Sequence, residues 1–170
     1  MNLLPFYDAQ AKFDRKLEEE RQLEECLRIP NKVLAFYQEL GELLQEMEWV
    51  FKDWKDRDLC RDDKEKQKKE WSDAWHFAIS IGNSFGHSDA IKHIDGFFDT
   101  KPTQERLQQL FLRCYNLNFY SSYEYGRMLR SLVTIGHLIG MTEEEMQKAY
   151  FEKHEENYAR QTDKEKGYVK

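Results

Sequence analysis

Apolar residues recur along this chain every three or four positions, the spacing that places side chains on one face of an α-helix. The first such stripe covers about residues 3–27 and includes Phe6, with the polar Gln10 inside it. Pro30 is expected to end this helix, because proline lacks the amide hydrogen that a helix interior uses. Asn31 is then a suitable N-cap for the next helix.

Later stripes predict a chain that is helical almost throughout. A charged connection is expected over about 55–63, and 82–102 is expected to be a long loop with one short helix around 90–98. Glutamates that follow Thr142 form a capping box, which predicts the start of the last helix. The remaining helices are expected over about 32–54, 64–81, 103–117 and 123–138.

Composition agrees with an all-α fold in a single domain, residues 1–170. The chain is 34% charged and 14% aromatic and has only 3 prolines, which favours long helices over a turn-rich sandwich. A net charge of −6 argues against nucleic-acid binding, and no apolar run is long enough to span a membrane. Three scattered cysteines without a CxxC motif and the lack of a signal-peptide pattern lead us to expect a cytoplasmic protein.

Two acidic pairs carry the strongest candidate chemistry. Glu39 and Glu42 are three residues apart in one predicted helix, and Glu70 and Asp73 have the same spacing in the next. Each pair therefore points two carboxylates from one helical face. Carboxylates brought together repel unless a cation lies between them, and oxygen ligands suit a hard ion such as Mg²⁺ or Mn²⁺. Taken alone, acidic stripes are more often solvated helix faces.

A second row of polar side chains lies on the last predicted helix. Lys153, Asn157 and Arg160 occur at i, i+4 and i+7, so an ammonium, an amide and a guanidinium share one face. Such a row can bind phosphates, although a mixed solvent face is the more common origin of the pattern. We expect the segment from about 153 to 170 to be mobile until a ligand orders it.

Together these features resemble the dimeric dUTPase family of the all-α, MazG-like nucleotide pyrophosphatases. The family pattern is an ExxE helix followed by an ExxD helix, which the two acidic pairs match. The resemblance also rests on a QAKFD segment at Gln10, an FKDW segment at 51–54, a DAWHF segment at 73–77 and a KxxxNxxRQ segment from Lys153 followed by Gly167-Tyr168.

The resemblance implies a helical bundle of the all-α NTP pyrophosphatase type, with a four-helix core that carries the metal site. It implies hydrolysis of dUTP to dUMP and pyrophosphate, with dUDP as a further candidate substrate, by a homodimer. Two or three Mg²⁺ ions would be held by the acidic pairs, and either Glu39 or Glu42 would act as general base. We expect residues 133–139 to contribute to the dimer interface.

The same resemblance assigns the substrate contacts. Gln10 would read the edge of uracil and Phe77 would pack against the base. The other residues expected around the base are Asp14, Trp54 and His76, although a lone histidine is more often structural. The phosphates would be bound by Lys52, Lys153, Asn157, Arg160 and Tyr168, with Lys164 or Lys166 as alternatives to Tyr168.

Three other interpretations compete with this one. A related pyrophosphatase could prefer dCTP or accept many dNTPs, which a comparison of substrates would reveal. A non-catalytic helical interaction protein would have the same acidic stripes but no Mg²⁺-dependent nucleotide binding. A ferritin-like di-iron bundle would need a second ExxH motif, which the chain lacks.

Overall fold

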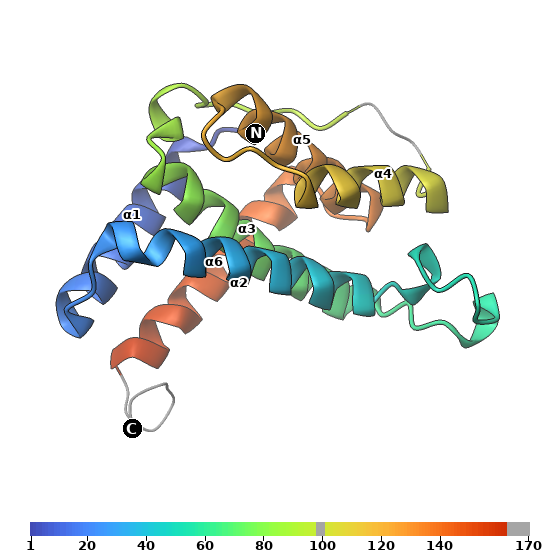
Figure 1. Ribbon diagram of the computed structural model, residues 1–170. Coiled ribbons are helices and arrows are strands. Elements are labelled where there is room, and N and C mark those ends of the chain that lie inside the picture. Colours follow the sequence, from blue (N-terminus) through green and yellow to red (C-terminus); the bar gives the residue numbers. More distant parts are fainter. Residues whose placement is uncertain (98–100, 163–170) are drawn as a thin grey trace.

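The computed structural model describes residues 1–97 and 101–162 and is all-α, as predicted. Within those residues two isolated β-bridges occur and no sheet forms. None of the described helices combines the length and the apolar character needed to cross a membrane. The α-helices in Figure 1 are α1 (Leu4–Arg21), α2 (Glu25–Gln45), α3 (Lys64–Ser84), α4 (Gln104–Tyr115), α5 (Ser122–Leu138) and α6 (Glu143–Thr162), with short 3-10 turns η1 (Glu48–Val50), η2 (Arg57–Leu59) and η3 (His87–Asp89).

Helix α3 is the centre of the molecule. It packs against α1, α2, α5 and α6, so it contacts nearly every other long element. Its Trp71 and Trp75 are fully buried and stack with ring centroids 5.3 Å apart. The Trp71 indole donates a hydrogen bond of 2.8 Å to the Leu132 carbonyl of α5. This buried aromatic pair anchors one face of α3 to α5, and α1, α2 and α6 also pack against α3.

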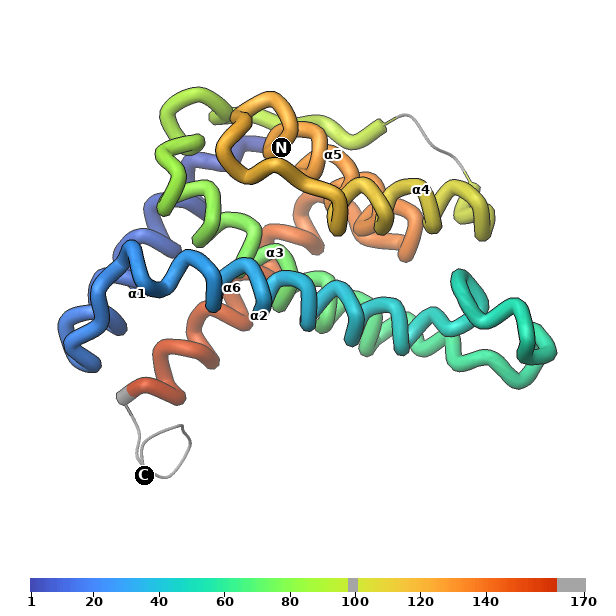
Figure 2. Tube along the Cα trace, viewed as in Figure 1, coloured from blue at the N-terminus to red at the C-terminus, as the bar shows by residue number. Residues whose placement is uncertain are grey.

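The connection between α2 and α3 is a hairpin of residues 46–63 that projects from the body of the molecule (Figure 2). The prediction that the second helix continues to Trp54 is therefore wrong. The hairpin closes on itself, because the Glu48 amide donates to the Arg61 carbonyl at 2.9 Å and the Asp63 amide donates to the Glu46 carbonyl at 3.0 Å. These cross-connection bonds compete with helix continuation and turn the chain back at Gln45.

The first helix boundary also differs from the prediction. Helix α1 ends at Arg21, where Gln22 adopts a left-handed conformation with φ of 53° and closes the last turn. Helix α2 begins at Glu25, so Pro30 lies inside it and Asn31 is not an N-cap. A proline this early in a helix removes only one amide hydrogen bond, here to the Cys26 carbonyl, which the packing of α2 against α3 outweighs.

The region after α3 is less helical than expected. The described residues 90–97 form no helix, so the short helix predicted around 90–98 is wrong over that range. Their backbone pairs instead with the first residues of the chain, through bonds from Leu3 N to Lys92 O at 2.8 Å and from Ile94 N to Met1 O at 3.0 Å. The loop is thereby fixed against α1.

The start of α6 follows the prediction closely. The Thr142 amide donates to Glu145 Oε2 at 2.8 Å and the Glu145 amide donates to Thr142 Oγ1 at 3.1 Å, which confirms the capping box.

The prediction that residues 133–139 contribute to a dimer interface is wrong for most of that segment. Val133 and Ile135 have no exposed surface, because α5 faces the chain's own core.

Gly82→Ala should destabilise the protein, because α3 lies directly against Tyr125 of α5. A Cβ atom at Gly82 would be only 2.1 Å from the Tyr125 hydroxyl oxygen and 2.6 Å from the ring carbon that carries it. We expect a loss of about 1–3 kcal/mol in the free energy of unfolding, measured by urea denaturation. Gly41→Ala is the matched control. Its Cβ would be 3.7 Å from the nearest atom, so helix propensity should leave stability unchanged or raised by about 0.5–1 kcal/mol. Equal effects of the two substitutions would contradict this packing.

Candidate active site

A cavity of about 410 Å³ lies among α1, α2, α3 and α6 and gathers most of the predicted site. Its walls combine acidic, basic and aromatic side chains from helices far apart in the sequence. The lining includes these residues named from the sequence: Gln10, Asp14, Glu39, Glu42, Glu70, Asp73, His76, Phe77, Lys153, Asn157 and Arg160.

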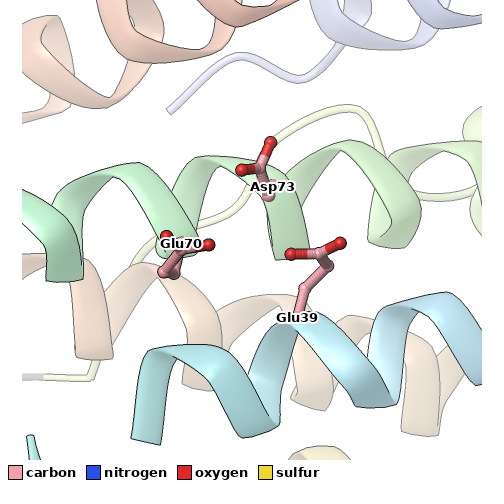
Figure 3. A group of neighbouring side chains, drawn as sticks. All are labelled: Glu39, Glu70 and Asp73. Atoms are coloured by element: carbon pink, nitrogen blue, oxygen red, sulfur yellow. The ribbon is translucent and has the colours of Figure 1, made fainter. Parts of the chain in front are cut away.

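Three of the four predicted metal ligands form one cluster. Figure 3 shows Glu39 reaching from α2 toward Glu70 and Asp73 on α3. Each of them offers a carboxylate oxygen, and these oxygens all lie within 4.8 Å of one another. Glu42 lines the same cavity outside this cluster, and its Oε1 accepts a hydrogen bond of 2.9 Å from Gln38. The i, i+3 spacing on two packed helices is what brings these carboxylates together.

Burial and mutual repulsion disfavour the charged forms of this cluster. Desolvation, followed by the charges of Asp73, Glu42 and Glu70, raises the pKa of Glu39 to about 7. The pKa values of Glu70 and Asp73 are also raised, again chiefly by burial. A divalent cation would remove this repulsion, and the donor set is made entirely of hard oxygens. The carboxylates therefore fit Mg²⁺ or Mn²⁺.

Mg²⁺ binding should weaken as the pH falls below about 7, because the ion must displace the proton held by Glu39. If one proton is displaced, the affinity should fall by about tenfold for each further pH unit. Calorimetric titration of Mg²⁺ in two buffers of different ionisation enthalpy would count the protons released. Binding that releases no proton near neutral pH would contradict the raised pKa of Glu39.

The predicted phosphate row lies at one wall of the cavity. Lys153 Nζ is 3.0 Å from Asp73 Oδ1, and the lysine side chain is largely buried. Burial lowers the pKa of Lys153, but the neighbouring Asp73 more than compensates, so the pKa is raised and the side chain stays charged. Asn157 and Arg160 line the same wall, and Arg160 also pairs with Glu156. The row thus sets cationic and amide groups beside the carboxylates.

Another part of the cavity lining is aromatic and includes the buried His76. Burial lowers the pKa of His76 to about 3, so its ring is neutral. Its Nδ1 lies 2.8 Å from the Ser72 carbonyl, which can only accept, so Nδ1 carries the hydrogen. The Nε2 atom is consequently an acceptor, and it is buried with no hydrogen-bond partner among the described residues. The half-buried Phe77 ring lines the cavity nearby.

Sequence reasoning missed Lys32 and Tyr150. Lys32 lines the cavity, is only 4% exposed and pairs with Asp14 at 3.3 Å. It precedes Glu39 by seven residues on α2, a helical spacing that could have identified it. Tyr150 is fully buried and donates a hydrogen bond to Gln10 at 3.1 Å. It precedes Lys153 by one turn of α6 but reads as an ordinary core residue.

Two predicted substrate contacts lie away from the cavity, and a third lies outside the described residues. Lys52 and Trp54 lie in the projecting hairpin, where Lys52 Nζ binds Glu48 at 2.6 Å and the Trp54 side chain is 74% exposed. They lie there because α2 ends at Gln45 and the chain then turns into the hairpin. Tyr168 lies outside the described residues, as do the alternatives Lys164 and Lys166.

A family model described as dUTPase matches residues 2–168, which is nearly the whole chain. None of the curated proteins or the solved structures that were compared matches it. The all-α fold and the carboxylates on facing helices agree with this family assignment. The chain therefore belongs to the dimeric, all-α dUTPase family and is a dUTP diphosphatase.

Proposed function

We propose that this protein hydrolyses dUTP to dUMP and pyrophosphate in a Mg²⁺-dependent reaction at the cavity between α2, α3 and α6. The reaction removes dUTP from the nucleotide pool and supplies a precursor of dTMP. The convergence of Glu39, Glu70 and Asp73 is the observation that carries the proposal. Partly buried carboxylates with raised pKa values destabilise the metal-free state, and binding of a cation offsets that cost.

The acidic residues hold the metal and accept a proton. Glu39, Glu42, Glu70 and Asp73 would bind two or three Mg²⁺ ions, with Mn²⁺ as a substitute. When bound there, Mg²⁺ would polarise phosphate oxygens and orient a water for attack. A carboxylate of the first pair, Glu39 or Glu42, takes the proton of that water. Glu39 lies in the close carboxylate cluster, whereas Glu42 lies outside it and is therefore freer to accept the proton.

The cations of α6 neutralise the phosphates. Lys153, Asn157 and Arg160 face the cavity beside the carboxylates, so they can bind oxygens of the triphosphate that the metal does not reach. When substrate arrives, Lys153 would exchange its contact with Asp73 for a phosphate oxygen, which frees that carboxylate for the metal. We keep Tyr168 as a further phosphate contact, and the closure of the segment 153–170 over substrate as part of the proposal.

The buried aromatic end of the cavity is the proposed uracil pocket. Gln10 and Asp14 lie there with His76 and Phe77. Among the described residues the buried Nε2 of His76 is an acceptor without a partner, and it would accept from the N3–H of uracil if substrate binding opened a path to it. A buried site with such fixed polar groups rejects a base that leaves them unpaired.

A homodimer remains the proposed assembly. Large apolar side chains stay exposed on one chain, including Leu34 at 66%, Leu59 at 67% and Leu112 at 66%. Contact with a second copy of the chain would remove this apolar surface from water. In such a dimer, Lys52 and Trp54 of the exposed hairpin would reach substrate only by lying at a partner's cavity. Light scattering coupled to size-exclusion chromatography would measure the assembly, and a monomer at micromolar concentration would contradict it.

Pyrophosphate release from dUTP, dCTP, dTTP and UTP, and orthophosphate release from dUDP, each with Mg²⁺ and with a chelator, test the proposal. We expect Mg²⁺-dependent release of pyrophosphate from dUTP and little from the other triphosphates. Orthophosphate release from dUDP would show that the diphosphate is also a substrate. Equal release from several triphosphates would show that the site accepts many nucleotides and has no uracil-specific pocket. Release in the presence of the chelator would contradict the metal role.

A further inference from the structure

We propose that Asp14 is a positioning residue that fixes the orientation of the Gln10 side-chain amide and thereby makes the pocket select uracil over cytosine. The inference rests on the proposed function, in which Gln10 faces the base. It assigns the selection to a group that need not touch the base itself.

The Gln10 amide is bound at both ends. Its Nε2 donates to Asp14 Oδ1 at 3.1 Å, and its Oε1 accepts from the Tyr150 hydroxyl at 3.1 Å. Gln10 is only 4% exposed, so these partners are not in exchange with bulk water. Within residues 1–97 and 101–162, the second hydrogen on Nε2 has no acceptor, although Gln10 lines the cavity.

Asp14 allows only one of the two orientations of this amide. A carboxylate accepts hydrogen bonds and cannot donate, so only the nitrogen end of the amide can face it. Turning the amide over would place two oxygens in contact, with neither able to donate. Tyr150 alone would not prevent this, because its hydroxyl also lies 3.2 Å from the Phe6 carbonyl and could donate there while accepting from the amide.

The Asp14 carboxylate is itself held in place. Lys32 Nζ lies 3.3 Å and the Ser80 hydroxyl 2.5 Å from Oδ2, which leaves Oδ1 for Gln10. Lys32 is anchored in turn by a 2.8 Å hydrogen bond to the Ser84 hydroxyl. Because Asp14 is buried and bonded from several helices, it cannot rotate to relieve a reversed amide.

The fixed amide presents a hydrogen-bond donor to the base. Uracil carries an acceptor oxygen at position 4, where cytosine carries an amino group that donates. A donor from Gln10 therefore pairs with uracil and opposes cytosine. Thymine also carries an oxygen at this position, so the amide orientation should not affect the choice between uracil and thymine.

Asp14→Asn is the decisive variant, because an asparagine can face either end of the Gln10 amide. We expect the ratio of kcat/KM for dUTP to that for dCTP to fall by about tenfold or more, since the reversed amide now accepts from cytosine. The ratio for dUTP over dTTP should stay at its wild-type value, which a general loss of packing would not achieve. Ser84→Ala is the control, because it removes a hydrogen bond from the same network without touching the amide, and both ratios should be unchanged.

Tyr150→Phe provides a second test that keeps the Lys32–Asp14 pair intact. It removes the donor to Gln10 Oε1, but Asp14 still admits only the nitrogen end of the amide, so both ratios should stay at their wild-type values. If Asp14→Asn does not fold, this variant decides alone, because a fall in its dUTP to dCTP ratio would assign the orientation to Tyr150. A wild-type dUTP to dCTP ratio in folded Asp14→Asn, or a lowered one in Tyr150→Phe, would overturn the inference and leave the proposed function standing. A wild-type protein that does not prefer dUTP would overturn the uracil pocket itself.

Discussion

Glu39→Gln is expected to abolish dUTP hydrolysis while making the metal-free protein more stable. Glu39 lies in the carboxylate cluster with Glu70 and Asp73, and its pKa is raised to about 7. Loss of a residue that merely supports a metal ligand typically costs 10–100-fold, so removal of a direct ligand should lower kcat/KM by more than about 100-fold. Glutamine keeps the shape of glutamate but removes a half-buried negative charge from a group of carboxylates that repel one another.

The stability effect has a defined pH dependence. Because the folded protein holds the Glu39 proton to a higher pH than the unfolded chain, the protonated group contributes stability below its ordinary pKa of 4.5. That contribution is lost as the pH rises through about 7. The variant should therefore gain the most over wild type above neutral pH, in thermal unfolding with a chelator present. Glu65→Gln on α3, where the glutamate side chain is 86% exposed, should change neither property. A Glu39→Gln protein that is less stable than wild type at high pH would contradict the repulsion.

Lys153→Met should raise KM for dUTP strongly and change the fold little. The lysine lies at the junction of the two proposed sites, 3.0 Å from Asp73 and beside the row that faces the phosphates. A hydrogen bond to a charged group contributes about 1.5–3 kcal/mol, which corresponds to roughly a 10–100-fold rise in KM for dUTP. Loss of the ammonium should also raise the pKa of Asp73 further, because Lys153 is the main influence that lowers it.

Lys148→Met is the matched control for this prediction. Lys148 lies on the same helix, but its side chain is 73% exposed and pairs only loosely with Glu152 at 3.7 Å. Steady-state kinetics of both variants with dUTP would separate a local role from a general loss of positive charge. Equal changes in KM for the two variants would rule out a specific phosphate contact at Lys153.

Much of the site could be predicted from the sequence because it depends on short helical spacings. Glu39 on one helix, and Glu70 with Asp73 on the next, needed only regular helices and a packed helix pair to converge, and Glu42 lines the same cavity outside their cluster. The same holds for Lys153, Asn157 and Arg160, which lie within two turns of α6. Local rules sufficed wherever the functional residues of one element share a face.

The remaining features depend on contacts between segments distant in the sequence. The end of α2 at Gln45 follows from bonds between Glu46, Glu48 and the strand-like residues before α3, which no helical pattern reveals. The pairing of residues 92–94 with the N-terminus likewise overrode the expected short helix. The link from Tyr150 to Gln10 joins positions 140 residues apart, so neither could be recognised from its own neighbours.

The most direct test is a crystal structure of the protein with Mn²⁺ and a non-hydrolysable imido analogue of dUTP, in which anomalous scattering locates the metal. Manganese substitutes for magnesium at oxygen sites and its signal identifies the ion without reference to geometry. We predict anomalous peaks between the carboxylates of Glu39, Glu70 and Asp73, adjoining the analogue's phosphates, with its base beside Gln10. Metal bound elsewhere, or an analogue bound in this cavity without metal, would contradict the proposal.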